Sequence, residues 1–306
     1  MKTVITYLAG VPSKNKKPEK TRVLELFAQG VNRVGDKGIA STGHVWKPSD
    51  VGVIQGFVHE DSPSSPHLRL RKSVVENQIS NNKKALIIDS NLFLYINNTN
   101  PHKYLRYSFN GVFPTTGEYF WNNSDPSRWQ QISKHMGITV KDWNSDGKYI
   151  LICLQRNGGW SMGGLDVMQW CNNTIKKIKQ YTDRPIVVRT HPGDKRAQQY
   201  IKQLKDPSVL ISRKPSIIDD FRNSWATITY NSSPGVASAI EGVPVFVTDP
   251  NPQVSQAYDV ANTDLRQIES PKTFDRDQWL NKLAMCHWNF EEVGNGTAWK
   301  HIRNYV

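Results

Sequence analysis

Short apolar segments alternate with helix-type segments along most of the chain, and this alternation restricts the fold more than any other feature. Each apolar segment has the length of a strand, and the segments between them repeat apolar residues with helical spacing. Parallel strands need such crossover helices, which cover both faces of the sheet. The pattern therefore predicts an α/β protein, with strands at 4–10, 51–59, 84–90, 149–155, 185–191, 208–212, 226–230 and 244–249.

The length of the chain predicts two domains. With 306 residues, of which 38% are hydrophobic, the chain is long enough for two cores of ordinary size. The polar stretch 141–148 interrupts the alternation and is the expected junction. We expect one domain over 1–145, a second over 146–280, and a C-terminal helical segment over 281–306. Whether that segment crosses back to the first domain is left open.

Cysteine content and hydropathy exclude several classes of protein. Cys153, Cys171 and Cys286 are too few and too scattered for a disulfide framework, and none has the spacing of metal ligands. The segment 1–10 lacks the apolar core of a signal peptide, and no segment reaches the length of a membrane span. We therefore expect a protein of the cytoplasm, of a host cell if it is viral, without stable membrane association.

The net charge of +12 predicts an anionic partner. Such an excess attracts nucleic acid, acidic membranes or nucleotides, and charge alone does not choose among them. Two basic clusters, 13–22 and 67–72, lie in the first domain; a solvated loop and an exposed helix face would explain them equally well. The candidates for phosphate contacts in these clusters are Lys14, Lys16, Lys17, Lys20, Arg22, Arg69, Arg71 and Lys72.

Two polar turns follow the first strands of the second domain, at the sheet edge where doubly wound folds bind ligands. The turn 156–164 is rich in glycine, which lets backbone amides approach a phosphate at the start of a helix. A glycine-rich turn without a ligand is the alternative. In the next turn, Pro192 ends the strand and presents the preceding histidine at this edge. The candidate ligands are Arg156, Gly158, Gly159, Ser161, Arg189 and His191.

A third polar turn follows the strand at 226–230. Ser232 and Ser233 offer hydroxyls and can cap the next helix, and Gly235 would allow a ligand to approach the helix start closely. Gly242 is expected to end that helix. An ordinary capped helix is the alternative, but three polar turns at one edge of a sheet favour a phosphate site.

These motifs resemble the donor half of GT-B glycosyltransferases, above all capsule-type Kdo transferases and bacterial sialyl- and polysialyltransferases. The shared features are His-Pro at 191–192, Ser-Ser-x-Gly at 232–235 and Gly-x-Pro-Val at 242–245, and the likeness covers roughly residues 84–250. It implies two Rossmann-like domains facing a central cleft. It also implies a nucleotide-sugar co-substrate, of UDP type. No acidic D-x-D pair follows a strand of the second domain, so we expect neither a metal ion nor another cofactor.

The resemblance also suggests which residues carry the chemistry. Where the family has an acidic motif after a strand of the first domain, this chain keeps one carboxylate, Asp89, and Ala237 replaces a glutamate that the family often has in the serine motif. Glycosyl transfer needs a base for the acceptor hydroxyl, and Asp89 is the first candidate, with Asp61 and His59 as alternatives. Cationic and amide groups of the three turns would stabilise the leaving phosphates.

The size, charge and motifs further resemble the compact enzymes with which bacteriophages add glucose or arabinose to 5-hydroxymethylcytosine in duplex DNA. Such an enzyme would flip the base out of the duplex to reach its hydroxymethyl group. The residues considered for stacking on that base are His102, Tyr104, Arg106, Tyr107 and Trp121.

Two other functions stay open. A capsule or lipopolysaccharide enzyme, acting on a saccharide acceptor, would explain the three turns equally well. A DNA-binding protein without catalytic activity would explain the charge but not the turns.

Overall fold

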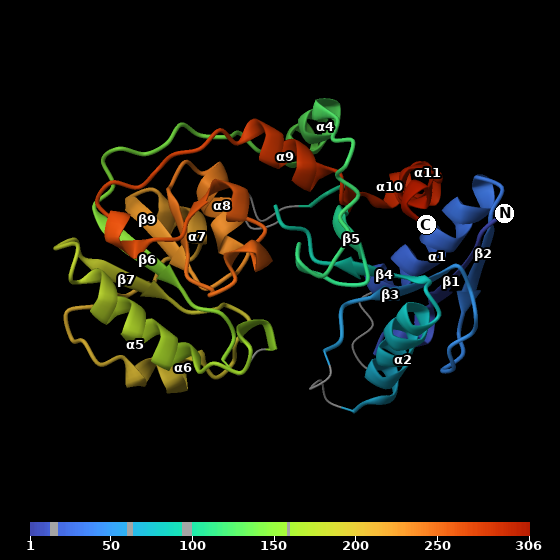
Figure 1. The fold of residues 1–306 in the computed structure, drawn as a ribbon, viewed down its shortest axis with the longest axis horizontal. Coiled ribbons are helices and arrows are strands. Elements are labelled where there is room, and N and C mark those ends of the chain that lie inside the picture. Colours follow the sequence, from blue (N-terminus) through green and yellow to red (C-terminus); the bar gives the residue numbers. More distant parts are fainter. Residues whose placement is uncertain (13–17, 60–63, 94–99, 158–159) are drawn as a thin grey trace. The chain divides into compact units, whose positions relative to one another are not determined.

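The computed structural model describes residues 1–12, 18–59, 64–93, 100–157 and 160–306, which form two compact units (Figure 1). Unit 1 comprises Met1–Asn91, Thr99–Met136 and Leu280–Val306, and unit 2 comprises Leu92–Asn98 and Gly137–Trp279. The C-terminal segment thus belongs to the same unit as the N-terminus. Each unit has its own six-stranded sheet.

The sheet of unit 1 has the strand order β12-β5-β4-β3-β1-β2. The four strands from β4 to β2 are parallel, whereas β5 pairs antiparallel with both β4 and β12. This part of the prediction was incomplete, because the sequence indicated only parallel strands. The strands are β1 (Thr3–Tyr7), β2 (Lys37–Ser41), β3 (Val51–Gln55), β4 (Lys84–Asp89), β5 (Leu105–Phe109) and β12 (His287–Trp288).

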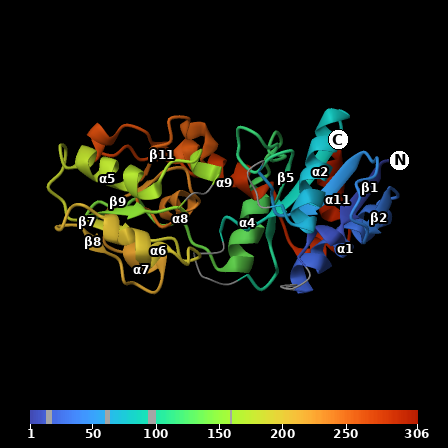
Figure 2. The same cartoon turned by 90° about the horizontal axis from the view of Figure 1, so that it is seen from below.

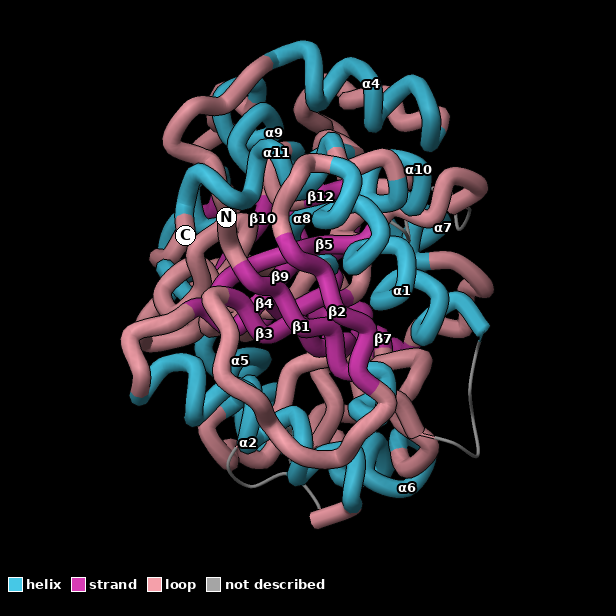
Figure 3. Tube along the Cα trace, turned by 90° about the vertical axis from the view of Figure 1, so that its right-hand side faces the viewer, coloured by secondary structure: helices cyan, strands magenta, loops and turns pink. Residues whose placement is uncertain are grey.

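Helices cover both faces of this sheet (Figure 3). On one face, Phe27 of α1 (Pro18–Arg33) packs against Trp299 of α11 (Thr297–Ile302), with 5.9 Å between the ring centroids. On the other face lies α2 (Pro66–Ser80): Gly52 of β3 lies so close to it that a Cβ there would come within 2.8 Å of Val74 Cγ1. The remaining helices of unit 1 are α4 (Pro126–Met136) and α10 (Phe290–Gly294).

The sheet of unit 2 is parallel throughout and has the order β11-β10-β9-β6-β7-β8. Its central strands are apolar and buried, as expected for strands with both faces covered. The strands are β6 (Tyr149–Cys153), β7 (Ile186–Arg189), β8 (Leu210–Ile211), β9 (Ser224–Thr229), β10 (Val245–Val247) and β11 (Ala261–Asn262).

The helices of unit 2 also lie on both faces of the sheet (Figure 2). α5 (Val167–Ile178) packs on alternate strand residues, among them Ile152 and Ile228, in one buried apolar cluster. α7 (Ile217–Phe221) and α8 (Pro234–Ile240) contact the opposite set of side chains, which includes Arg189 and Val245. The two remaining helices are the short α6 (Ala197–Tyr200) and α9 (Asp277–Ala284), which leads from unit 2 to unit 1. In the described parts of the chain, no helix has the length and hydropathy to cross a membrane.

Candidate functional site

The carboxyl ends of the parallel strands of unit 2 meet at one edge of the sheet. From β6, the sheet continues through β7 and β8 on one side and through β9, β10 and β11 on the other. In doubly wound sheets, ligands bind where the strand order reverses in this way. The segments that leave β6, β7, β9 and β10 at this edge therefore form the candidate donor site.

A hydrogen-bond network joins the segments after β6, β9 and β10. Asn231, which follows β9 and is 2% exposed, donates from its backbone amide to Gln155 Oε1 at 3.1 Å. Its side-chain amide donates to the Ser161 carbonyl oxygen at 2.9 Å and to Asp249 Oδ2 at 2.7 Å. Gln155 Nε2 donates to Ser161 Oγ at 3.1 Å. These bonds fix the three segments relative to one another.

Three oxygen atoms at this edge are buried without a hydrogen-bond partner among the described residues: Thr229 Oγ1 on the last residue of β9, Asn231 Oδ1 and Ser232 Oγ. A buried polar atom without a partner costs roughly 1–3 kcal/mol, so folded proteins satisfy nearly all of them. A bound ligand would provide the missing partners. The Ser232 hydroxyl can donate to a phosphate oxygen, whereas Asn231 Oδ1 can only accept and therefore suits a ligand hydroxyl.

His191 follows β7 and is held by its own turn. The backbone N–H of Gly193 donates to His191 Nδ1 at 3.0 Å. A Cβ at Gly193 would come within 2.7 Å of Arg156 Nη2 and 3.1 Å of His191 Cε1, so the guanidinium and the imidazole lie side by side. Burial lowers the pKa of His191 and the charge of Arg156 lowers it further, while Asp194 acts in the opposite direction.

The start of α5 differs from the prediction. The sequence suggested that the turn 156–164 presents a free helix start to a phosphate. Instead, Val167 N donates to Asn157 Oδ1 at 3.1 Å, and the next two amides donate to the N-cap carboxylate of Asp166. The first amides of α5 are thus already satisfied by protein oxygens. Gly158 and Gly159 lie outside the described residues.

Arg189 and Gly235 have structural surroundings that the sequence did not indicate. Arg189 Nη1 donates to Asp220 Oδ2 at 2.6 Å, and the Asp220 side chain is 2% exposed. A Cβ at Gly235 would meet Ala257 Cβ at 3.1 Å and Val245 Cγ1 at 3.3 Å. Arg189 therefore neutralises a buried carboxylate, and Gly235 permits close packing of α8. We include neither residue in the donor site proposed below.

In unit 1, Asp89 ends β4 and pairs with Arg106 of β5. Arg106 Nη2 donates to Asp89 Oδ2 at 2.6 Å, and the two residues are also register partners of the antiparallel strands. The Arg106 side chain is only 6% exposed, whereas that of Asp89 is 30% exposed. The structure thus places one carboxylate oxygen on a buried arginine and leaves the carboxyl group accessible. His59 follows β3 and is half-buried, and Asp61 lies outside the described residues.

The basic residues predicted to contact DNA fall into three groups. Arg22 on α1 and Arg69 on α2 are exposed, and Lys20 and Lys72 are partly exposed. Arg71 is only 8% exposed, and its Nε donates to a backbone carbonyl oxygen, so the alternative explanation, an exposed helix face, does not hold at this residue. The remaining three, Lys14, Lys16 and Lys17, lie outside the described residues.

Three of the residues considered for stacking on a flipped base belong to the interior. Tyr104 and Tyr107 are fully buried, and Arg106 is 5% exposed. None of the three offers a free face to a base. His102 is exposed and stacks on a neighbouring histidine ring at 4.1 Å, and Trp121 is half-buried.

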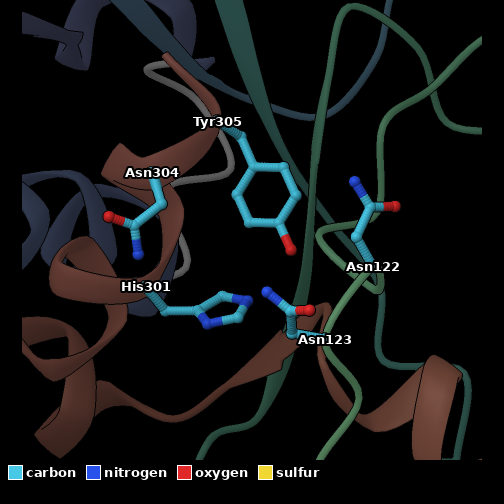
Figure 4. Close-up of a pocket in the computed structure, with 5 residues that line it drawn as sticks. All are labelled: Asn122, Asn123, His301, Asn304 and Tyr305. Atoms are coloured by element: carbon cyan, nitrogen blue, oxygen red, sulfur yellow. The ribbon is translucent and has the colours of Figure 1, made fainter.

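A separate depression of about 280 Å³ lies on unit 1 (Figure 4). It is lined by Asn122, Asn123, His301, Asn304 and Tyr305, and it contains none of the predicted site residues. In the part of the chain that the structure describes, no cluster of three or more His, Cys, Asp or Glu residues could hold a metal ion.

No protein-family model and no curated protein matches the sequence. Among solved structures, the beta Kdo 2,7 transferase of Thermosulfurimonas dismutans KpsC is similar, with a TM-score of 0.55 and 13% identity over 99% of this chain and 100% of that chain. The beta Kdo 2,4 transferase of the same protein has a TM-score of 0.53 and 12% identity, over 93% of this chain and 89% of that chain. At such identities the likeness concerns the fold: the chain has the α/β, GT-B fold that its sequence predicted.

Proposed function

We propose that the protein is a glycosyltransferase that moves a sugar of glucose or arabinose type from a UDP-sugar to 5-hydroxymethylcytosine in duplex DNA. The observation that carries the proposal is the edge of the unit 2 sheet. There, Arg156 and His191 lie side by side after the neighbouring strands β6 and β7. Two oxygens without a partner in the described part of the chain, Asn231 Oδ1 and Ser232 Oγ, follow β9 on the other side of β6. Ser161 and Ser233 complete the proposed donor site.

The contact of His191 with its turn specifies which nitrogen would meet the donor. Because Nδ1 accepts a hydrogen bond from Gly193 N, the proton of the neutral ring lies on Nε2. A lowered pKa favours this neutral form. We therefore assign His191 Nε2–H as a hydrogen-bond donor to the diphosphate, beside the permanent charge of Arg156.

The reaction needs a base and stabilisation of the leaving group. The hydroxymethyl oxygen forms a bond to the anomeric carbon while the bond from that carbon to the diphosphate oxygen breaks. The proton passes to the base, for which we propose Asp89, and the nucleoside diphosphate leaves with the electron pair. Arg156, His191 and Ser232 would stabilise its negative charge.

The support for a DNA acceptor is electrostatic. The chain carries a net charge of +12, and Arg22, Arg69 and Lys72 hold accessible positive charges on α1 and α2 of unit 1. Each cation that meets a DNA phosphate releases counterions, which gives affinity that falls with salt. Neutralising Lys14, Lys16 and Lys17 would test the contribution of the N-terminal cluster.

Mass spectrometry of duplex DNA tests the function directly. Hydroxymethylated duplex, incubated with the protein and a panel of nucleotide sugars, should gain the mass of one sugar per modified cytosine with one of the donors. Unmodified duplex is the control. DNA of unchanged mass with every donor, together with binding that is indifferent to nucleotide sugars, would instead support a DNA-binding protein without catalytic activity.

The donor site can be tested by Ser232→Ala, because the hydroxyl that it removes has no hydrogen-bond partner among the described residues. The free energy of unfolding should stay the same or rise, while the loss of a hydrogen bond to a charged phosphate should weaken UDP binding roughly 10- to 150-fold. Calorimetry and urea unfolding measure the two quantities.

The matched control is Ser238→Ala in α8, the helix that follows Ser232. Ser238 Oγ donates to the Val243 carbonyl oxygen at 3.0 Å, so its loss should lower stability and leave UDP affinity unchanged. Equal UDP affinity of the wild type and the Ser232 variant would remove Ser232 from the site.

A saccharide acceptor is the second candidate, and the two solved structures favour it, since both are Kdo transferases by name. It predicts transfer to a saccharide primer and none to hydroxymethylated DNA. The same donor panel, offered with a Kdo-bearing primer, distinguishes the two acceptors.

A further inference from the structure

Arg71 is a buried arginine whose terminal nitrogens have no hydrogen-bond partner in the described part of the chain. Its Nε donates to the carbonyl oxygen of Gly10, in the turn after β1, at 2.7 Å. Its Nη1 lies over Gly56, in the turn after β3, where a Cβ would come within 2.8 Å. Among the described residues, no oxygen accepts a hydrogen bond from Nη1 or Nη2, and no carboxylate lies within ion-pair distance of Arg71.

Among the described residues, the charges around Arg71 do not balance. The carboxylate that acts on it is Asp89, which is already paired with Arg106 at 2.6 Å. In the described part of the chain, two guanidinium groups and one carboxylate leave an excess of one positive charge at the carboxyl ends of β1, β3 and β4. Burial lowers the pKa of Arg71 to about 10, with the charge of Asp89 acting in the opposite direction, so Arg71 is still protonated at neutral pH. His67, one turn earlier on α2, has a lowered pKa because of burial and the charge of Arg71, and adds no charge there at pH 7.

A buried cation without a counter-ion destabilises the fold, so buried charges are usually paired, and a bound anion would supply the missing pairing here. The contact with Gly10 and the packing over Gly56 hold the guanidinium in one orientation, so little side-chain entropy remains to be lost on binding. Its free Nη atoms form a fork that matches two oxygens of one oxyanion. The site therefore fits a singly charged oxyanion, which would restore local neutrality.

We propose that Arg71 binds one phosphodiester group of the acceptor DNA strand. Unit 1 would then recognise a backbone phosphate in addition to the modified base. This inference rests on the proposed function. A carboxylate has the same charge, but α2 also carries Arg69 and Lys72 on its accessible side. Further cations beside Arg71 suit a nucleic-acid strand, which carries a negative charge at every linkage, better than a ligand with a single carboxylate.

The test compares two trinucleotides with 5-hydroxymethylcytosine in the middle, one with phosphodiester and one with neutral methylphosphonate linkages. Calorimetry should show that the wild type binds the charged form more tightly. Arg71→Gln should reduce this preference tenfold or more, and Arg71→Lys should restore only part of it, because lysine lacks the fork. Lys84→Gln is the matched control: it removes an equal charge at the opposite end of β4, where Lys84 pairs with Glu118 at 3.0 Å.

The wild-type comparison holds even if the glutamine variant does not fold. Equal affinity of the wild type for both trinucleotides, or an unchanged preference in a folded Arg71→Gln variant, would overturn the proposal. Tighter, Arg71-dependent binding of free Kdo would overturn it in favour of a carboxylate. Sugar transfer does not enter this measurement, so a protein that binds the charged trinucleotide through Arg71 but transfers no sugar supports this inference and contradicts the proposed function.

Discussion

At the scale of single residues, Asp89 has both the ion pair of a structural residue and the accessible carboxyl group that a general base needs. Its Oδ2 accepts from Arg106, which is buried, so the pair stabilises the junction of β4 and β5. The carboxyl group is nevertheless 30% exposed at the carboxyl end of the strand. Substitution by asparagine separates the two roles, because the amide oxygen can still accept from Arg106 but cannot take up the proton.

We expect Asp89→Asn to lower kcat about a hundred- to ten-thousand-fold, the usual contribution of a general base. Affinities for the nucleotide and for DNA should persist. Asp50→Asn is the control, since Asp50 also pairs with a cation in unit 1, Lys83 at 2.8 Å, but has no proposed catalytic role. Turnover of the Asp89 variant near the wild-type rate would place the base elsewhere, with His59 and Asp61 next to test; loss of folding would show a structural role.

At the scale of elements, the passage from α8 into β10 depends on one glycine. Gly242 ends the helix, as expected from the sequence, with φ at +78°, and a Cβ there would lie 2.0 Å from the carbonyl oxygen of Asp142. Gly163 also has a positive φ, +59°, but the space around its Cβ position is empty. Alanine at Gly163 would therefore introduce backbone strain alone, whereas alanine at Gly242 would introduce both backbone strain and steric overlap.

Gly163→Ala should cost about 1–2 kcal/mol, the price of a left-handed conformation for alanine. Gly242→Ala should cost more than about 3 kcal/mol, since the backbone at Asp142 must also move. Chemical denaturation of unit 2, followed by tryptophan fluorescence, measures both values. Equal losses for the two variants would show that the chain relaxes freely at Gly242.

At the scale of the whole molecule, the last 27 residues are part of unit 1 although unit 2 separates them from it in the sequence. β12 pairs with β5, and Arg128 of α4 donates to Glu292 of α10 at 2.8 Å. Both side chains of this ion pair are nearly buried. Unit 1 can therefore be completed only after the chain has returned from unit 2.

Glu292→Ala should destabilise unit 1 by about 3–5 kcal/mol, because it leaves the buried guanidinium of Arg128 without its counter-ion. The neighbouring Glu291 is exposed, and Glu291→Ala should change stability by less than about 0.5 kcal/mol. Differential scanning calorimetry compares the two variants. A similar, small effect of both would mean that the C-terminal segment adds little to the stability of unit 1.

The sequence alone predicted the strands that consist of consecutive apolar residues, including all four that carry the candidate donor site. It did not predict β2, of which most residues are exposed, or β5, which holds Arg106 as its second residue. It also missed Asn231 and Asp249 as parts of the site, although Asn231 directly follows one predicted strand and Asp249 ends another. A polar residue at a strand end is too common to distinguish by itself, and only the network shows which ones matter.

Local patterns determined the α/β class, because the periodicity of apolar residues reports which face of each segment can be buried. Tertiary structure decided the role of each arginine. Arg71, Arg106 and Arg189 look alike in the sequence, yet Arg106 pairs with Asp89, Arg189 pairs with Asp220, and Arg71 has no carboxylate partner among the described residues. A charge acquires its role from groups that are distant in the chain, since burial and pairing depend on where those groups meet after folding.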